Sequence, residues 1–195
     1  DFDGLNGGSA CIQQQFAFLT SVTGAKPVYT STYLTGSIPQ CLFDLPAIEV
    51  IHLSGNGISG ELPEVPTGSG ISDISMGYNR LDGTIPESIQ RLDSLTYLDL
   101  SHNYLSGTCD YMTNYDLTTG DNATTLYLDS NRLSGNIPAQ FQDAVSINVL
   151  TGNLFECNWM QSDLPVNDPE ANKYSCGTHV LYVSLSAVVR LRGEG

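Results

Sequence analysis

Positive charge is scarce in this 195-residue chain, because seven Lys and Arg residues stand against 21 Asp and Glu, which gives a formal net charge of −14 at pH 7. Such a chain repels phosphate backbones and anionic lipid headgroups, which argues against nucleic acid as a partner. No Asp/Asn/Gly loop of the EF-hand type is present, so a solvated acidic surface is favoured over a specific metal site, although carboxylates could bridge Ca²⁺ weakly. We predict no cofactor and no metal site.

Cysteine is also infrequent, and the five cysteines contain no CxxC pair and have no metal ligands at zinc spacing. A zinc site is therefore not predicted, and two disulfides plus one remaining thiol are expected, as in proteins of an oxidising compartment. The glycosylation sequon at Asn122 agrees with an extracellular or cell-surface location. The five positions are Cys11, Cys41, Cys109, Cys157 and Cys176.

Long hydrophobic runs are missing as well. The first residues lack the basic and apolar regions of a signal peptide, so if the protein is secreted, its leader is expected to have been removed or never included. Residues 180–189 are mostly apolar, but a bilayer requires roughly 20 such residues. A membrane association is therefore expected only through a segment that continues beyond residue 195.

What the chain does contain is an internal repeat. Apolar residues recur in fixed slots around an asparagine, and the pattern returns in four full copies with a partial copy on either side. Successive asparagines are separated by 23, 24, 28 and 22 residues, and they are Asn56, Asn79, Asn103, Asn131 and Asn153.

Each copy predicts a short strand with one buried and one exposed face, as in Ile51-His52-Leu53 and Leu98-Asp99-Leu100. Stacked copies form a parallel sheet, and each copy buries its apolar residues against its neighbours. The asparagine follows the strand, where its buried amide is expected to bond the backbone of its own turn and of the adjacent one.

These copies resemble the plant-type leucine-rich repeat, LxxLxLSxNxLSGxIP, over residues 33–156. The resemblance is carried by the stretch from Leu98 to Gly107 and by Ser134-Gly135-Asn136-Ile137-Pro138. It implies an α/β solenoid, a right-handed arc with a concave parallel β-sheet, and a second short strand or 3₁₀ segment at residues 59–63, 82–86 and 134–138. The sequence around Cys157 and Cys176 also resembles the ending of leucine-rich repeat proteins from diatoms and related algae, in which a membrane-spanning helix commonly follows.

A solenoid has two open ends that need caps. Residues 1–32 are predicted as an N-terminal cap with a helix at residues 11–22, closed by a Cys11–Cys41 disulfide. Residues 157–195 are predicted as a C-terminal cap closed by a Cys157–Cys176 disulfide. Cys109 lies too many strands from the other cysteines to pair with them. It is either a buried small hydrophobic residue or an intermolecular thiol.

The outward strand positions form the candidate binding face. His52, Ser75 and Asp99 suggest a hydrolytic triad, but the serine lies between the other two, and His52 and Asp99 are expected about 10 Å apart. Enzymatic activity is therefore not predicted. Val149 is expected to continue this outward column in the last repeat. The predicted partner-binding residues are His52, Asp73, Ser75, Tyr97, Asp99, Tyr127 and Asp129.

An insertion after Cys109 lengthens the third repeat to 28 residues. Polar insertions in repeats often carry binding or glycosylation sites, but they are equally often surface loops without a role. The candidate residues of this insertion rim are Tyr111, Tyr115 and Asp116, with the sequon at Asn122.

The sequence thus favours a recognition domain that binds a protein or peptide ligand. One alternative is a structural subunit that packs against neighbouring subunits in an extracellular filament, coat or membrane complex. A third possibility, inhibition of a secreted wall-degrading enzyme, rests on the resemblance to plant inhibitors of polygalacturonase.

Overall fold

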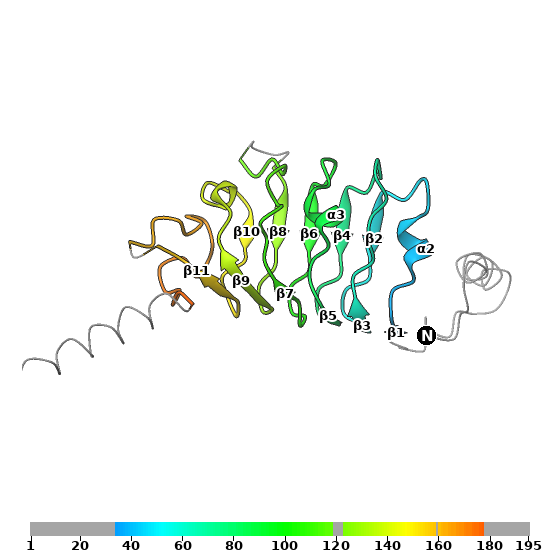
Figure 1. The fold of residues 1–195 in the computed structure, drawn as a ribbon, viewed down its shortest axis with the longest axis horizontal. Coiled ribbons are helices and arrows are strands. Elements are labelled where there is room, and N and C mark those ends of the chain that lie inside the picture. Colours follow the sequence, from blue (N-terminus) through cyan, green and yellow to red (C-terminus); the bar gives the residue numbers. More distant parts are fainter. Residues whose placement is uncertain (1–33, 119–122, 159, 178–195) are drawn as a thin grey trace, which may run out of the picture.

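The computed structural model describes residues 34–118, 123–158 and 160–177. Strands from successive repeats lie side by side in two rows that run along the solenoid (Figure 1). Within these described ranges, no helix is long and apolar enough to cross a membrane.

The first row is a five-stranded parallel sheet in the order β10-β8-β6-β4-β2. The middle side chains of the four three-residue strands, such as Ile74 and Leu98, are buried, while their neighbours point outward. The predicted leucine-rich repeat solenoid with its parallel sheet is therefore confirmed. The strands are β2 (Val50–His52), β4 (Asp73–Ser75), β6 (Tyr97–Asp99), β8 (Thr125–Tyr127) and β10 (Ile147–Asn148).

The second row consists of two three-stranded parallel sheets. Its strands at residues 57–61, 80–82 and 132–136 begin two residues earlier than the segments expected from the repeat pattern. One sheet contains β1 (Thr35–Gly36), β3 (Gly57–Glu61) and β5 (Arg80–Asp82), and the other contains β7 (Ser106–Gly107), β9 (Arg132–Asn136) and β11 (Leu154–Glu156).

Short helical turns follow the second strand in three repeats. Each begins directly after a proline, whose fixed φ and missing N–H suit the start of a helix. They are α2 (Gln40–Phe43), α3 (Glu87–Gln90) and the 3₁₀ turn η2 (Ala139–Phe141), and each buries at least one apolar side chain, Phe43, Ile89 and Phe141.

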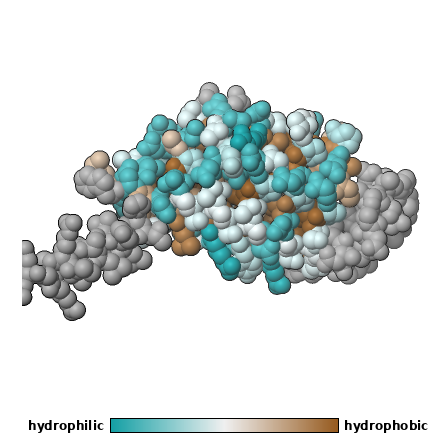
Figure 2. Space-filling view, viewed as in Figure 1, coloured by the Kyte–Doolittle hydropathy of each residue, from teal (hydrophilic) through white to brown (hydrophobic). Residues whose placement is uncertain are grey.

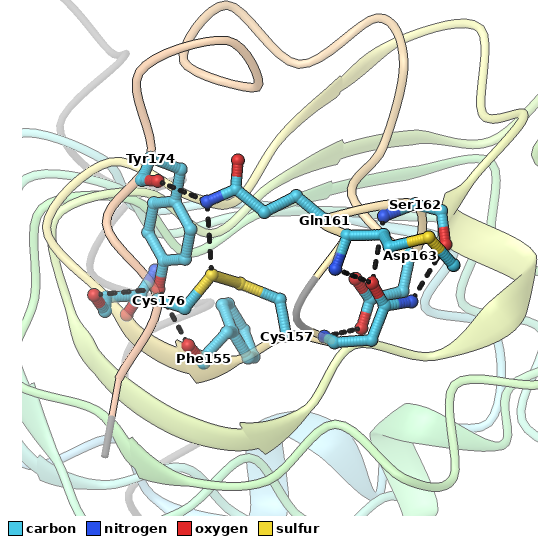
Figure 3. Close-up of a disulfide and its surroundings, with 10 residues drawn as sticks. Phe155, Cys157, Gln161, Ser162, Asp163, Tyr174 and Cys176 are labelled. Carbon is cyan, nitrogen blue, oxygen red and sulfur yellow. Dashed lines mark hydrogen bonds between the residues drawn. A yellow bond between two sulfur atoms is a disulfide. The ribbon is translucent and has the colours of Figure 1, made fainter. Parts of the chain in front are cut away.

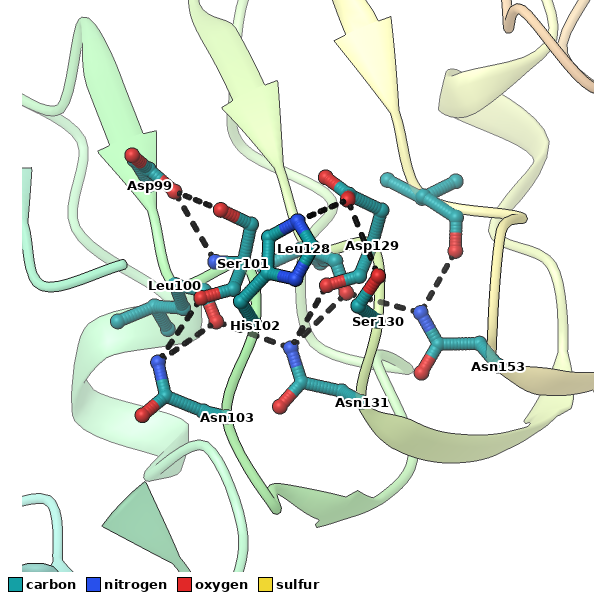
Figure 4. A network of polar contacts seen from close by, with 11 residues as sticks. Asp99, Leu100, Ser101, His102, Asn103, Leu128, Asp129, Ser130, Asn131 and Asn153 are labelled. Atoms are coloured by element: carbon teal, nitrogen blue, oxygen red, sulfur yellow. Dashed lines mark hydrogen bonds and ion pairs between the residues drawn. The ribbon is translucent and has the colours of Figure 1, made fainter. Parts of the chain in front are cut away.

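A ladder of buried asparagines joins the repeats. Asn103 is typical: its Oδ1 accepts from the amide of Leu81 in the preceding repeat at 2.9 Å, and its Nδ2 donates to the carbonyls of Met76, Leu100 and Ser101 at 3.1 Å each. Asn131 makes the same set of bonds one repeat further on, as Figure 4 shows in part. These bonds satisfy backbone groups that are buried away from water. The predicted role of the recurring asparagine is therefore confirmed.

The residue before each ladder asparagine has a positive φ. Glycine occupies this place in the first and last repeats, with φ +72° at both Gly55 and Gly152. In the middle repeats the position is held by Tyr78, His102 and Ser130, with φ of 57°, 52° and 56°. Non-glycine residues rarely adopt this conformation, so the backbone is strained at Tyr78 and His102.

The last repeat has a different register from the one predicted. Ile147 pairs with Leu126 and Asn148 pairs with Tyr127, so Asn148 faces outward and Val149 is fully buried. The expectation that Val149 continues the outward column is wrong. The reason is one additional residue between strand and asparagine, because Asn153 bonds the carbonyl of Val149 four residues back, whereas Asn131 bonds one three residues back.

The C-terminal cap is closed by the predicted Cys157–Cys176 disulfide, whose Cα atoms are 5.5 Å apart (Figure 3). The buried Asp168 accepts from the amides of Val149 and Leu150, at 2.7 and 3.1 Å, through its Oδ2. In the inner strands the corresponding amides bond the next strand. The Asp168 carboxylate therefore takes the place of a further strand at the end of the sheet.

The N-terminal predictions lie largely outside the described residues. This applies to the cap at residues 1–32 with its helix, and also to Cys11, Asn122 and residues 180–189. Cys41 is disulfide-bonded, but its pairing with Cys11 stays a prediction.

Cys109 is a free thiol and is fully buried, which confirms the buried alternative. Burial raises the pKa of this thiol to about 12, with a further contribution from the neighbouring Asp110. Because the thiolate is the reactive species, we expect Cys109 to resist a thiol reagent such as Ellman's reagent at pH 8 in the native protein and to react within minutes in denaturant. Rapid stoichiometric labelling of the native protein would contradict this placement.

Candidate functional site

The concave face is defined here as the outward side chains of β2, β4, β6, β8 and β10. Strand register arranges them in two rows across the sheet. One row pairs Asp73 with Tyr97 and Tyr97 with Thr125, and the other pairs Ser75 with Asp99 and Asp99 with Tyr127. The sheet therefore brings most of the predicted binding residues together on one surface.

Tyr97 and Tyr127 form an edge-to-face pair at the centre of the concave face. Their ring centroids are 6.0 Å apart and their planes differ by 76°. Both side chains are partly exposed. Partial burial raises the pKa of the Tyr97 hydroxyl, and the nearby Asp99 raises it further, so the hydroxyl remains a hydrogen-bond donor at neutral pH.

Asp99 is held in place by Ser101. Its Oδ1 accepts from the Ser101 amide at 3.0 Å and from the Ser101 hydroxyl at 2.7 Å (Figure 4). A side chain at position 77 would meet these oxygens, since a Cβ placed on Gly77 would lie 2.8 Å from Asp99 Oδ1. The glycine therefore leaves the room that this carboxylate occupies.

At the N-terminal end of the concave face, His52 of β2 contacts Asp73 of the adjacent strand β4. The Nε2 of His52 lies 3.0 Å from Oδ1 of Asp73, and the histidine side chain is 60% exposed. Ser75, which lies between His52 and Asp99 in its row, bonds the hydroxyl of Ser54 at 2.9 Å rather than either of them.

Asp129, predicted as a residue of the binding face, is buried at the turn after β8. Its Oδ2 lies 3.5 Å from Nε2 of His102 (Figure 4). Burial raises the pKa of the Asp129 carboxyl, and His102 partly offsets that effect.

A second aromatic pair, which the sequence pattern did not predict, lies beside the concave face. The rings of Tyr78 and His102 stack with centroids 4.1 Å apart and planes 16° from parallel, and Tyr78 is 61% exposed. The sequence does carry one signal for this pair, since both residues stand directly before a ladder asparagine. The backbone there has a positive φ, which glycine or asparagine adopts more readily than tyrosine. Strained, exposed residues of this kind are frequent at functional sites.

The insertion rim is only partly a surface. Tyr115 is buried, and its hydroxyl donates to the carbonyl of Ile89 at 2.6 Å, so the prediction that it lies on the rim is wrong. Met112 and Leu117 of the same insertion also join the core. The insertion packs against the preceding repeat, since Tyr115 bonds the carbonyl of Ile89 and the amide of Tyr111 donates to the side chain of Gln90.

Tyr111 and Asp116 remain as rim residues. Tyr111 is 42% exposed, and the guanidinium of Arg91 lies 4.6 Å from its ring centroid. Its amide donates to the buried Gln90, which fixes the start of the insertion. Asp116 is exposed and its Oδ1 accepts from the amide of Thr118 at 3.2 Å.

A cavity of about 370 Å³ lies away from the concave face, and it contains none of the predicted binding residues. Residues 65–69, 88 and 91–94 line it. In the part of the chain that the structure describes, no group of three His, Cys, Asp or Glu side chains could hold a metal ion.

The repeated strands, the asparagine ladder and the capped sheet define the leucine-rich repeat class. The family model of the Leucine Rich Repeat matches residues 47–68, 94–112 and 122–144. The chain is also 35% identical, over 170 residues, to Receptor-like protein 18 of Arabidopsis thaliana, and the match covers 82% of this chain. It spans only 19% of that relative.

Solved structures agree with this class. The crystal structure of PEPR1-AtPEP1 matches with a TM-score of 0.58 and 27% identity, over 67% of this chain and 18% of that chain. The Arabidopsis receptor kinase HAESA, in complex with the peptide hormone IDA and the co-receptor SERK1, matches with a TM-score of 0.51 and 26% identity, over 69% and 24%. The chain therefore has the leucine-rich repeat fold and is similar to parts of plant receptor ectodomains.

Proposed function

We propose that the concave face binds a protein or peptide partner at the cell surface or outside the cell. The observation that carries this proposal is the Tyr97–Tyr127 pair, partly exposed on a rigid sheet beside two carboxylates. Tyrosines on a rigid support lose little conformational entropy on binding and offer both an apolar ring and a hydroxyl. Preorganised binding of this kind requires no catalytic group.

The relatives support the same function and location. HAESA binds a peptide hormone and a co-receptor, and the disulfide of the C-terminal cap suits an oxidising compartment. As a finer assignment, we place the repeats in the plant SGxIP type, supported by Ser106-Gly107 and Ser134-Gly135-Asn136-Ile137-Pro138, and we propose a resemblance to extracellular leucine-rich repeat proteins of diatoms and related algae.

Removing both concave tyrosines tests the proposal. We expect the Tyr97→Ala/Tyr127→Ala variant to lose at least about tenfold in affinity for the native partner, since central aromatic anchors typically each contribute more than 1 kcal/mol to binding. The partner is first captured on the immobilised wild-type protein from native cell-surface extract, and its affinity for each variant is then measured by biolayer interferometry.

Tyr104→Ala is the matched control, because Tyr104 is 49% exposed but lies before β7 of the second row, where Arg132 covers its ring. This variant should bind like the wild type. Unchanged binding by the double variant, with a wild-type circular dichroism spectrum, would remove the concave face as the site and favour a structural role for other faces.

A further inference from the structure

Resting on the proposed function, we propose that the occupant of the concave face is a positively charged peptide segment. One of its lysine or arginine side chains sits among Tyr97, Tyr127, Asp73 and Asp99, which we call the cation subsite. The proposed function places a protein or peptide partner on the concave face, and the cation subsite specifies the charge of the segment that binds there.

The register of the sheet forms the subsite. Asp73 pairs directly with Tyr97, and Asp99 pairs directly with Tyr127, so each tyrosine has an aspartate opposite it on the adjacent strand. Adjacent strands of a sheet lie about 4.8 Å apart. The edge-to-face arrangement of the two rings leaves part of each exposed. Carboxylates and aromatic rings thus alternate over three neighbouring strands, with Ser75 and Thr125 in the two remaining positions.

Both kinds of group attract cations. A carboxylate accepts charge-assisted hydrogen bonds from an ammonium or guanidinium, and the face of a tyrosine ring attracts the same charge. Asp99 is preorganised for this purpose, since both bonds from Ser101 end on Oδ1 and no described residue donates to Oδ2. A guanidinium or ammonium group would find that oxygen oriented before it arrives.

The protein does not neutralise this face with its own described lysines and arginines. Arg91 pairs with Glu87, Lys173 lies 3.8 Å from Glu170, Arg132 lies over a tyrosine ring, and Arg80 is on β5 of the second row. Among the described lysine, arginine and histidine side chains, only His52 contacts a carboxylate of the subsite, that of Asp73.

Charge complementarity therefore points to a cationic occupant. Two tyrosines and two carboxylates that no described lysine or arginine neutralises would repel an acidic peptide and gain little from a neutral polar one. The same arrangement would bind a lysine or arginine side chain through both its charge and its apolar stem.

Defined peptides test the proposal on the full chain with its disulfides intact. We expect acetyl-(Gly-Arg)₄-amide to bind in isothermal titration calorimetry, and the serine and glutamate analogues to bind at least about tenfold more weakly. The Asp73→Asn/Asp99→Asn variant should lose about tenfold in affinity for the arginine peptide. Asparagine retains the oxygen that accepts from Ser101, so this variant changes charge with little change in shape.

The Glu61→Gln/Asp82→Asn variant is the matched control, because it removes the same charge from exposed positions on β3 and β5. It should change the affinity less than about twofold if the subsite is specific. An equal loss in the two variants, equally tight binding of the serine peptide, or no binding of the arginine peptide would each overturn the cationic occupant.

Failure of this proposal can be told apart from failure of the proposed function. If the Tyr97→Ala/Tyr127→Ala variant loses its native partner while the two aspartates prove irrelevant, the concave face binds but its occupant is not cationic. If neither pair of substitutions affects capture of the native partner, the concave face itself is not the binding surface.

Discussion

Replacing Asn103 by leucine is expected to lower the free energy of unfolding by about 3 kcal/mol, because the amide of Leu81 loses its acceptor, at a cost of about 1–3 kcal/mol, and three carbonyls each keep only one of two donors. Leucine has nearly the same volume, so packing changes little. The carbonyls of Met76, Leu100 and Ser101 lose a donor, and the amide of Leu81 loses its acceptor. Urea unfolding followed by circular dichroism measures the difference.

Asn136→Leu serves as the control, since Asn136 is exposed at the end of β9 and surface substitutions usually change stability by less than about 0.5 kcal/mol. Asn103→Asp provides a second check, because it keeps the acceptor for Leu81 but removes the three donor contacts. If Asn103→Leu unfolds at the same urea concentration as Asn136→Leu, the ladder does not stabilise the solenoid in the way its geometry indicates.

The regular part of this fold could be predicted from the sequence because the same physical constraint recurs in every repeat. A strand of three residues with a buried centre, followed by an asparagine that must satisfy a tight turn, leaves one register for Ile51, Ile74, Leu98 and Leu126. The placement of Tyr97, Asp99 and Tyr127 on one face follows directly from that register.

The failures occur where the repeat is irregular. The final strand lies in the segment Val145-Ser146-Ile147-Asn148-Val149-Leu150, whose apolar residues fit two registers. The observed register places one additional residue between the strand and Asn153, and in it the amides of Val149 and Leu150 donate to Asp168. Tyr115 lies in an insertion that no other repeat resembles. Nothing in its local sequence indicates that its hydroxyl meets the carbonyl of Ile89.

The candidate site was predictable as a set of positions but not as a set of contacts. The contact of His52 with Asp73 and the stacking of Tyr78 on His102 depend on side-chain rotamers and on the positive φ before the ladder asparagine. Periodicity specifies which side chains face outward, whereas these contacts are specified by the geometry between neighbouring repeats.

The disulfide of the C-terminal cap carries the second large expected effect. Removing it in the Cys157→Ala/Cys176→Ala variant should destabilise the last repeats by about 3 kcal/mol, since the bond closes a loop with a sequence separation of 19 residues. Stability in a solenoid is transmitted between neighbours, so the loss should be concentrated near the cap. Native-state hydrogen exchange should therefore be faster at the amides of Val149 and Leu150, whose bonds to Asp168 depend on an ordered cap.

The amide of Met76 is the internal reference for this experiment, because it bonds Asp99 between two central strands far from the cap. Its exchange should change much less than that of Val149. Cys109→Ala provides the matched variant, since it removes a buried cysteine that forms no disulfide. If the cap variant exchanges Val149 and Leu150 no faster than the wild type does, then Asp168 and the packing of Tyr174 against β11 hold the end of the sheet without help from the covalent bond.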